Sequence, residues 1–188
     1  MSSSDGAPAR LRLFVALDLP AAVRAALARF RDAAADPAIW RPLPEASFHV
    51  TLAFLGHRPA QDAVRVAAVL DGVDGGPAPE LALGAVLLLP PRRARVLTVG
   101  LEDRGGAAAR LQAEVSAGLA AAGLCEPEAR PFRPHVTVAR LLPGARAPRT
   151  VEAMPDGVAF TAGAVTLYRS RPGRGGAVYE PRFTRTLG

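Results

Sequence analysis

Two segments of the chain, residues 47–55 and 133–141, carry the same tripeptide within similar runs of apolar and β-branched residues. The tripeptide is His49-Val50-Thr51 in the first segment and His135-Val136-Thr137 in the second. Such runs predict β-strands, in which successive side chains point to opposite faces. Each strand therefore presents His and Thr about 6.5 Å apart on one face, with Val on the other.

A purely structural role is the simpler explanation for a single histidine on a half-buried strand, and Thr is common in strands. Two matching copies that use two of the three histidines in the chain favour a shared chemical role instead. We expect His57, the third histidine, at the surface without a role.

The chemistry that this pattern predicts is acid and base catalysis by two imidazoles. Histidine gains and loses a proton near neutral pH, so one neutral ring can take a proton from water while a charged ring gives one to a leaving oxygen. The threonine hydroxyls suit a negatively charged oxygen between the rings. Cleavage of a phosphodiester fits this set, and it needs no metal if the protein supplies the positive groups.

Composition indicates one globular domain rather than several. The chain has 188 residues, of which 49% are hydrophobic, enough for one sizeable core. We expect residues 1–10 to be a disordered extension and residues 11–188 a single domain. The formal charge of +6 suits RNA, but every basic residue is Arg and none is Lys, so compositional bias explains the charge as well.

The lone cysteine, Cys125, excludes an internal disulfide and a cysteine-based metal site. It favours a reducing, cytoplasmic location. The apolar stretch 11–19 is too short and too interrupted by charge for a membrane segment. We therefore expect a cytoplasmic protein without membrane contact or cofactor, and a monomer.

Hydrophobic patterns place strands and helices in an order that repeats approximately between the two halves of the chain. We expect Gly56 to close the first motif strand and residues 40–44 to interrupt regular structure. The expected strands are 11–17, the two motif segments, 81–89, 94–101, 158–168 and 177–187; helices are expected after Pro20, over 60–70 and over 106–122, and loops over 71–79 and 169–176. This order predicts an internally duplicated α+β fold with mostly antiparallel sheets.

The ordered set of motifs resembles a known superfamily, the 2H phosphoesterases. The first motif continues as Leu-Ala-Phe-Leu-Gly56, and residues 130–134, Arg-Pro-Phe-Arg-Pro, precede the second. Within that superfamily the chain resembles more closely the bacterial and archaeal RNA 2',3'-cyclic phosphodiesterases, historically called 2'-5' RNA ligases. The similarity extends from residues 11–20 through Thr166-Leu-Tyr168 to the C-terminus.

This resemblance implies a bilobal fold with two mostly antiparallel sheets, helices on the outside and a central cleft that holds both motifs. It implies metal-independent hydrolysis of RNA 2',3'-cyclic phosphate ends to 2'-phosphomonoesters, with reversible 2'-5' RNA ligation as an accompanying activity. Carried over by motif position, His49 is the proton donor to the 3'-oxygen and His135 the base that activates water. Thr51 and Thr137 bind the nonbridging phosphate oxygens.

Other positions are weaker candidates for substrate binding. In a regular strand Arg140 would share the face of the motif valines, so contact with phosphate requires a bulge or a strand end. Other arginines could line an RNA path, and two aromatic residues could stack on a base. For each of these, a solvated surface arginine or a core aromatic is at least as good an explanation. The residues concerned are Arg95, Arg171, Arg174, Phe48 and Tyr168.

Alternative functions differ in what they require of the histidines. A 2H enzyme acting on a small cyclic nucleotide or a 2'-5' oligonucleotide would use the same pair with a different pocket. A non-catalytic basic RNA-binding module would tolerate loss of both histidines. A metallohydrolase is disfavoured because metal-ligand motifs are missing from the sequence, and an NTP-dependent ligase because there is no lysine.

Overall fold

The computed structural model describes residues 9–126, 130–151, 153–154, 158–173 and 176–188. Residues 1–8 of the expected N-terminal extension, and Arg174, lie outside this part of the chain. Arg10 already belongs to the first strand, so this strand begins one residue earlier than the pattern predicted.

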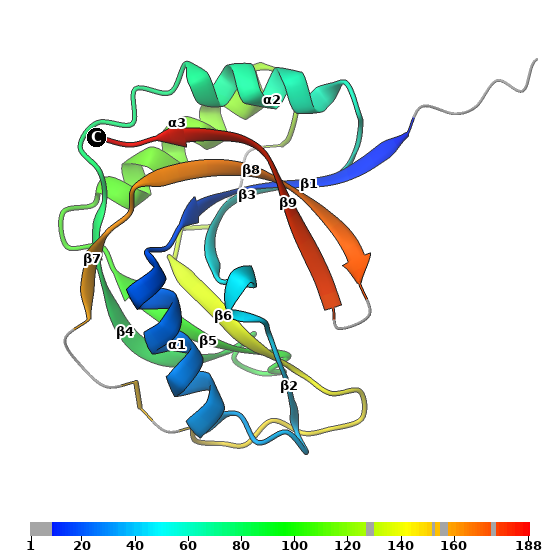
Figure 1. Cartoon of the computed structure of the whole chain (residues 1–188), viewed down its shortest axis with the longest axis vertical. Coiled ribbons are helices and arrows are strands. Elements are labelled where there is room, and N and C mark those ends of the chain that lie inside the picture. Colours follow the sequence, from blue (N-terminus) through cyan, green and yellow to red (C-terminus); the bar gives the residue numbers. More distant parts are fainter. Residues whose placement is uncertain (1–8, 127–129, 152, 155–157, 174–175) are drawn as a thin grey trace, which may run out of the picture.

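The described residues form a curved antiparallel sheet with helices packed against it (Figure 1). Its strands are β1 (Arg10–Asp18), β2 (Trp40–Pro42), β3 (His49–Pro59), β4 (Glu80–Leu89), β5 (Val96–Glu102), β6 (His135–Leu141), β7 (Ala159–Thr161), β8 (Ala164–Gly173) and β9 (Gly176–Thr186). The helices are α1 (Ala21–Ala34), α2 (Asp62–Asp71) and α3 (Ala107–Ala121), with a 3-10 turn η1 (Glu45–Ser47). The predicted α+β class and antiparallel pairing are confirmed.

The sheet consists of two parts joined at one narrow point. Strand order is β7-β4-β5-β6-β3-β1-β8-β9, and β2 pairs with the end of β6 on the side opposite β5, the side on which β6 also meets β3. The link between β6 and β3 is a single register pair, Val50 with Val136, at the centres of the two motifs. The two expected sheets are therefore continuous, but only through this pair. Internal duplication stays a prediction.

The three helices pack on different strands of the sheet. α1 contacts β6, and α2 contacts β3, β8 and β9, whereas α3 contacts α2 and strands of both parts of the sheet, β3 and β4. Four-residue spacing explains the packing of α3, because Leu111, Val115 and Leu119 are all buried. In the described part of the chain, no helix is long and apolar enough to span a membrane.

Four predictions about strands and loops were wrong. The expected strand over 158–168 is two strands, because β7 pairs with β4 and β8 pairs with β1 in the other part of the sheet. Gly56 does not end its strand: β3 runs on to Pro59, and Gly56, with φ of 69°, sits at a bulge opposite β1. Residues 40–42 form the short edge strand β2, where proline is tolerated. The expected loop over 169–176 is mostly strand, because β8 and β9 continue pairing to Gly173 and Gly176.

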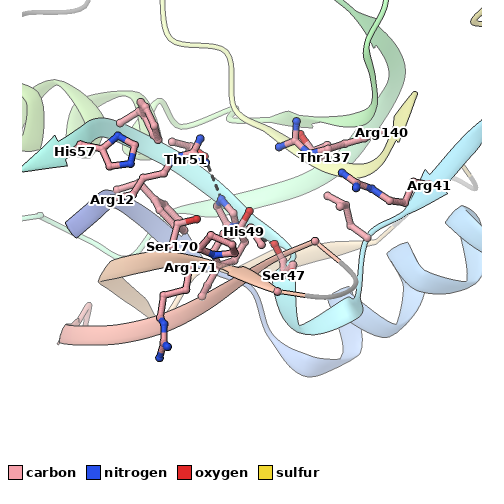
Figure 2. A pocket seen from close by; sticks show the side chains of 18 of the residues that line it. Arg12, Arg41, Ser47, His49, Thr51, His57, Thr137, Arg140, Ser170 and Arg171 are labelled. Atoms are coloured by element: carbon pink, nitrogen blue, oxygen red, sulfur yellow. Dashed lines mark hydrogen bonds between the residues drawn. The ribbon is translucent and has the colours of Figure 1, made fainter. Parts of the chain in front are cut away.

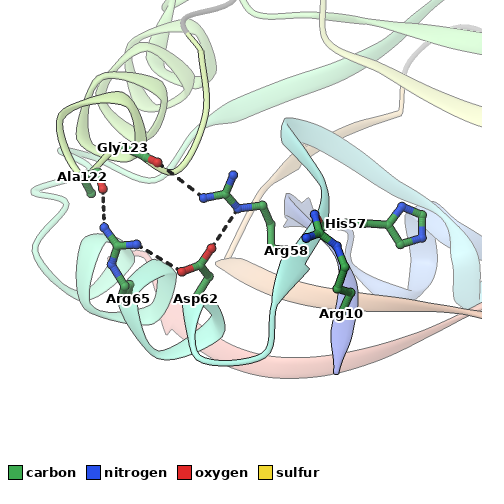
Figure 3. A network of polar contacts seen from close by, with 7 residues as sticks. All are labelled: Arg10, His57, Arg58, Asp62, Arg65, Ala122 and Gly123. Atoms are coloured by element: carbon green, nitrogen blue, oxygen red, sulfur yellow. Dashed lines mark hydrogen bonds and ion pairs between the residues drawn. The ribbon is translucent and has the colours of Figure 1, made fainter. Parts of the chain in front are cut away.

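A nearly buried carboxylate joins α2 to the C-terminal end of α3 (Figure 3). The Asp62 side chain is 4% exposed and forms ion pairs with Arg58 at 2.9 Å and Arg65 at 3.1 Å. The same two guanidinium groups donate to the carbonyls of Gly123 and Ala122. They thereby satisfy carbonyls that the end of a helix leaves without partners. This network links β3, α2 and the end of α3 to one another.

Candidate active site

A cleft of about 780 Å³ contains both tripeptide motifs (Figure 2). His49 and Thr51 line it from β3, and His135 and Thr137 line it from β6. The Val50–Val136 pair fixes the two motifs side by side, and both valines are buried on the opposite face. Strand alternation and this one register pair therefore bring two imidazoles and two hydroxyls into one cavity, as predicted.

Each motif histidine is held by the backbone two residues before it. His49 Nδ1 donates to the carbonyl of Ser47 at 2.8 Å, and His135 Nδ1 donates to that of Arg133 at 2.8 Å. A carbonyl only accepts, so Nδ1 carries the proton in both neutral rings. Nε2 is then the atom of each ring that remains available for proton transfer in the cleft.

Thr51 contacts the imidazole of His49, the histidine of the same motif. Its Oγ1 lies 3.2 Å from His49 Nε2 (Figure 2). Because Nδ1 holds the proton of the neutral ring, the hydroxyl donates to Nε2, and the direction reverses when the ring is charged. The hydroxyl is thus placed to contact an oxygen that receives a proton from this ring.

Aromatic rings surround His49 and remove much of its contact with water. The ring centroids of Phe14 and Tyr179 lie 4.8 and 5.2 Å from that of His49. Burial lowers the pKa of His49, and the electrostatic influence of His135 and Arg140 acts in the same direction. The Ser47 carbonyl and the Asp18 carboxylate oppose this shift and raise the pKa, but the net direction is downward.

Asp18 lies at the end of β1, directly opposite His49 in the antiparallel register. Tyr168 donates to its Oδ1 and Thr166 to its Oδ2, each at 2.7 Å. Thr166 also contacts Thr184 at 2.9 Å, so the network extends into β9. Burial and the Asp18 carboxylate raise the pKa of Tyr168. A fixed negative charge therefore lies behind the first histidine.

Arg140 reaches the histidine face because β6 contains a bulge. Between β5 and β6 the register passes from Thr98–Thr137 to Leu97–Ala139, so Val138 is the extra residue. Val138 and Ala139 are both fully buried, which returns Arg140 to the face of Thr137. The bulge that phosphate contact requires is therefore present, and Arg140 lines the cleft.

The two ends of the cleft differ in character. At one end, the Arg12 guanidinium lies 5.1 Å from the ring centroid of Phe54, which is 57% exposed, and Arg12 pairs in register with His57. At the other end, Arg41 of β2 pairs in register with Arg140. Figure 2 shows these sets on opposite sides of His49.

The remaining predicted residues have other positions. Phe48 is 3% exposed and packs under Arg31, and a ring this buried offers no face to a base, which corrects that expectation. Tyr168 supports Asp18 from outside the lining of the cleft, and Arg95 lies on the β4–β5 connection, also outside it. Arg171 lines the cleft but forms an ion pair with Glu180 at 2.7 Å.

Several cleft residues escaped the sequence analysis for identifiable reasons. Phe14, Phe54 and Tyr179 stand in strands where an aromatic residue suggests core. Arg41 follows a tryptophan in a segment that looked irregular. Asp18 offered the one usable signal, an acidic residue at the end of an otherwise apolar strand. In the described part of the chain, no group of three or more His, Cys, Asp or Glu is arranged for a metal ion.

Two imidazoles bound to the backbone through Nδ1 rather than Nε2, two hydroxyls and an arginine in one cleft of an antiparallel α+β fold define a two-histidine phosphoesterase type of site. Residues 18–174 match the model of the 2'-5' RNA ligase superfamily, and the chain belongs to that family.

Sequence relatives cover most of the chain. RNA 2',3'-cyclic phosphodiesterase of Escherichia coli is 31% identical over 175 residues, which are 90% of this chain and 93% of the relative. RNA 2',3'-cyclic phosphodiesterase of Thermus thermophilus is 34% identical over 149 residues, 69% of this chain and 68% of the relative.

Solved structures with the same architecture include E. coli LigT complexed with 3'-AMP and TT0787 of Thermus thermophilus. LigT with 3'-AMP superposes with a TM-score of 0.81 at 28% identity, covering 95% of this chain and 99% of that chain. TT0787 has a TM-score of 0.81 at 30% identity, covering 94% and 98%. The fold is therefore shared over almost the full length of both.

Proposed function

We propose that this protein hydrolyses 2',3'-cyclic phosphate ends of RNA to 2'-phosphomonoesters, using His49 and His135 as a proton donor and acceptor. One observation carries the proposal: each histidine uses Nδ1 to bind a backbone carbonyl at 2.8 Å, leaving Nε2 available in a shared cleft. The names of the sequence relatives specify the substrate class.

In the proposed reaction, neutral His135 removes a proton from water through Nε2 as the water oxygen attacks phosphorus. The bond between phosphorus and the 3'-oxygen breaks, and charged His49 gives its Nε2 proton to that oxygen. The products are a 3'-hydroxyl and a 2'-phosphate. The two rings end in exchanged protonation states and are reset by solvent. A 5'-hydroxyl that attacks phosphorus in place of water breaks the same bond to the 3'-oxygen and joins the RNA ends by a 2'-5' linkage; the reverse of that step cleaves the linkage and re-forms the cyclic phosphate.

Negative charge on the nonbridging oxygens is stabilised from both strands. Thr51 and Thr137 supply hydroxyl donors next to their histidines, and Arg140 supplies a fixed positive charge through the β6 bulge. Charge-assisted hydrogen bonds of this kind act most strongly where water is excluded. The aromatic wall of Phe14 and Tyr179 provides such an environment around His49.

The terminal base has a platform at the Arg12 end of the cleft. Phe54 is 57% exposed there, although a ring of its size is ordinarily covered. Its stacking with the Arg12 guanidinium at 5.1 Å fixes the orientation of the exposed ring. A base stacked on Phe54 would be held without readout of its identity, as in other single-strand binding sites.

We also propose that the enzyme acts as a monomer, because one chain supplies both motifs and the residues between them. Its single cysteine is compatible with work in the reducing cytoplasm.

Substitution of either motif histidine tests the proposal. Each of His49→Ala and His135→Ala should lower kcat on an RNA oligonucleotide with a 2',3'-cyclic phosphate end by roughly a hundredfold or more, the usual scale for loss of a general acid or base. His57→Ala removes the same side chain from the same strand as His49 and should have a far smaller effect. Near-normal turnover by either motif variant would eliminate the mechanism.

A further inference from the structure

Two arginines stand directly opposite each other at the β2 end of the cleft. Arg41 of β2 pairs in register with Arg140 of β6, and both side chains line the cavity. Figure 2 shows the two guanidinium groups beside Thr137, away from Arg12 and His57. Like charges opposite each other on neighbouring strands destabilise a sheet. The stability of the sheet therefore does not explain why two arginines occupy these positions.

The fold presents Arg41 by fixing the residue before it. Trp40 is 1% exposed, so strand alternation directs Arg41 to the opposite face, toward the cleft. Backbone hydrogen bonds on both sides hold β2 in place: Trp40 N donates to Asp36 O at 2.8 Å, and Leu43 N donates to Val138 O at 2.9 Å. The second of these ends on the bulge that turns Arg140 into the cleft.

No described carboxylate neutralises the positive charge of Arg41 or of Arg140. Among the described residues, no carboxylate forms an ion pair with Arg41 or Arg140, whereas Arg171 in the same cleft is paired with Glu180. The two strands that carry these guanidinium groups lie about 5 Å apart in the sheet. Such a pair suits two anionic groups, or one group that bridges both arginines.

We propose that Arg41 forms a second phosphate subsite, which binds a phosphodiester of the RNA other than the one being hydrolysed. This rests on the proposed function, in which Arg140 serves the scissile phosphate. Neighbouring phosphates in a nucleic-acid strand are separated by one nucleoside, so adjacent arginines on β2 and β6 can hold consecutive charges. The second phosphate belongs either to the strand with the cyclic end or to a strand whose 5'-hydroxyl replaces water.

The subsite gives the enzyme a preference for oligonucleotides over mononucleotides. A mononucleoside 2',3'-cyclic phosphate carries one phosphate and leaves Arg41 without an anion. A dinucleotide with the same cyclic end adds one phosphodiester. The ratio of kcat/KM on the dinucleotide to kcat/KM on the mononucleotide therefore measures the contribution of the subsite. A change in the chemical step affects both substrates equally and does not alter this ratio.

Arg41→Gln should lower this ratio roughly tenfold, the scale of one lost charge-assisted hydrogen bond. Arg41→Lys, which keeps the charge but not the planar fork, should lie between Arg41→Gln and the wild type. Arg93→Gln is the charge-matched control, because Arg93 is exposed on the β4–β5 connection outside the cleft. Raising the salt concentration should reduce the wild-type preference but have less effect in Arg41→Gln.

A second experiment shows whether the second phosphate belongs to the strand with the cyclic end or to the incoming strand. If the hydrolysis ratio is unchanged in Arg41→Gln, but joining of a 5'-hydroxyl RNA to a cyclic end falls roughly tenfold relative to mononucleotide hydrolysis, the second phosphate belongs to the incoming strand. Unchanged ratios in both arms, or an equal fall in Arg93→Gln, would overturn the subsite. Failure of the wild type on both hydrolysis substrates would instead count against the proposed function.

Discussion

At His49, burial and a nearby carboxylate act on the same imidazole in opposite directions. Burial is the larger effect and lowers the pKa, while the Asp18 carboxylate raises it. A proton donor has to be charged when the reaction begins. Asp18 therefore helps the ring to keep its proton, and Tyr168 and Thr166 hold the carboxylate in place.

Asp18→Asn should shift the pH dependence of kcat/KM in a direction that the structure fixes. Without the negative charge the pKa of His49 falls further, so the ring loses its proton at lower pH. The alkaline side of the kcat/KM profile should consequently move to lower pH, as measured with a cyclic phosphate substrate across the pH range. Tyr168→Phe keeps the carboxylate and should move it less; an alkaline side that stays in place in Asp18→Asn would refute this role.

Among the elements, β3 and α2 are connected by the Asp62 network. Asp62→Asn should lower the free energy of unfolding by about 2 kcal/mol, which corresponds to about 4–8 °C in Tm for a chain of this size. The cost stays below that of a fully buried pair, because the side chains of Arg58 and Arg65 are 28% and 52% exposed and water can solvate them.

Glu102→Gln is the matched control in the same thermal unfolding experiment. It breaks the ion pair with Arg104, whose side chain is 86% exposed, and should change stability by less than about 0.5 kcal/mol. Equal shifts in the Asp62 and Glu102 variants would show that burial of the Asp62 carboxylate does not matter.

The elements also show which parts of this fold a sequence can predict. The spacing of Leu111, Val115 and Leu119 predicted α3 correctly, because a buried stripe repeats with the period of the helix. The positions of Arg140 and Arg41 depend on a bulge and on an edge strand of three residues. Both are set by pairing with distant strands, so no local pattern specifies them. The motif histidines were predictable because one alternation rule applies twice.

On the scale of the whole molecule, the candidate active site forms where the two parts of the sheet meet. One register pair, Val50 with Val136, is the connection between them, and the proposed catalytic side chains lie on the opposite face from these valines. Each part supplies one histidine and one threonine. A substrate phosphate between the rings would contact both parts at once, so the arrangement of the whole sheet sets the distance on which two-histidine catalysis depends.

Hydrolysis of an RNA oligonucleotide ending in a 2',3'-cyclic phosphate, in the presence of EDTA and with identification of the product isomer, is the decisive test of two-histidine catalysis. The expected product is a 2'-phosphate, formed by the wild type and not by the His49→Ala/His135→Ala double variant. A 3'-phosphate product, activity abolished by the chelator, or equal activity in the double variant would contradict this mechanism.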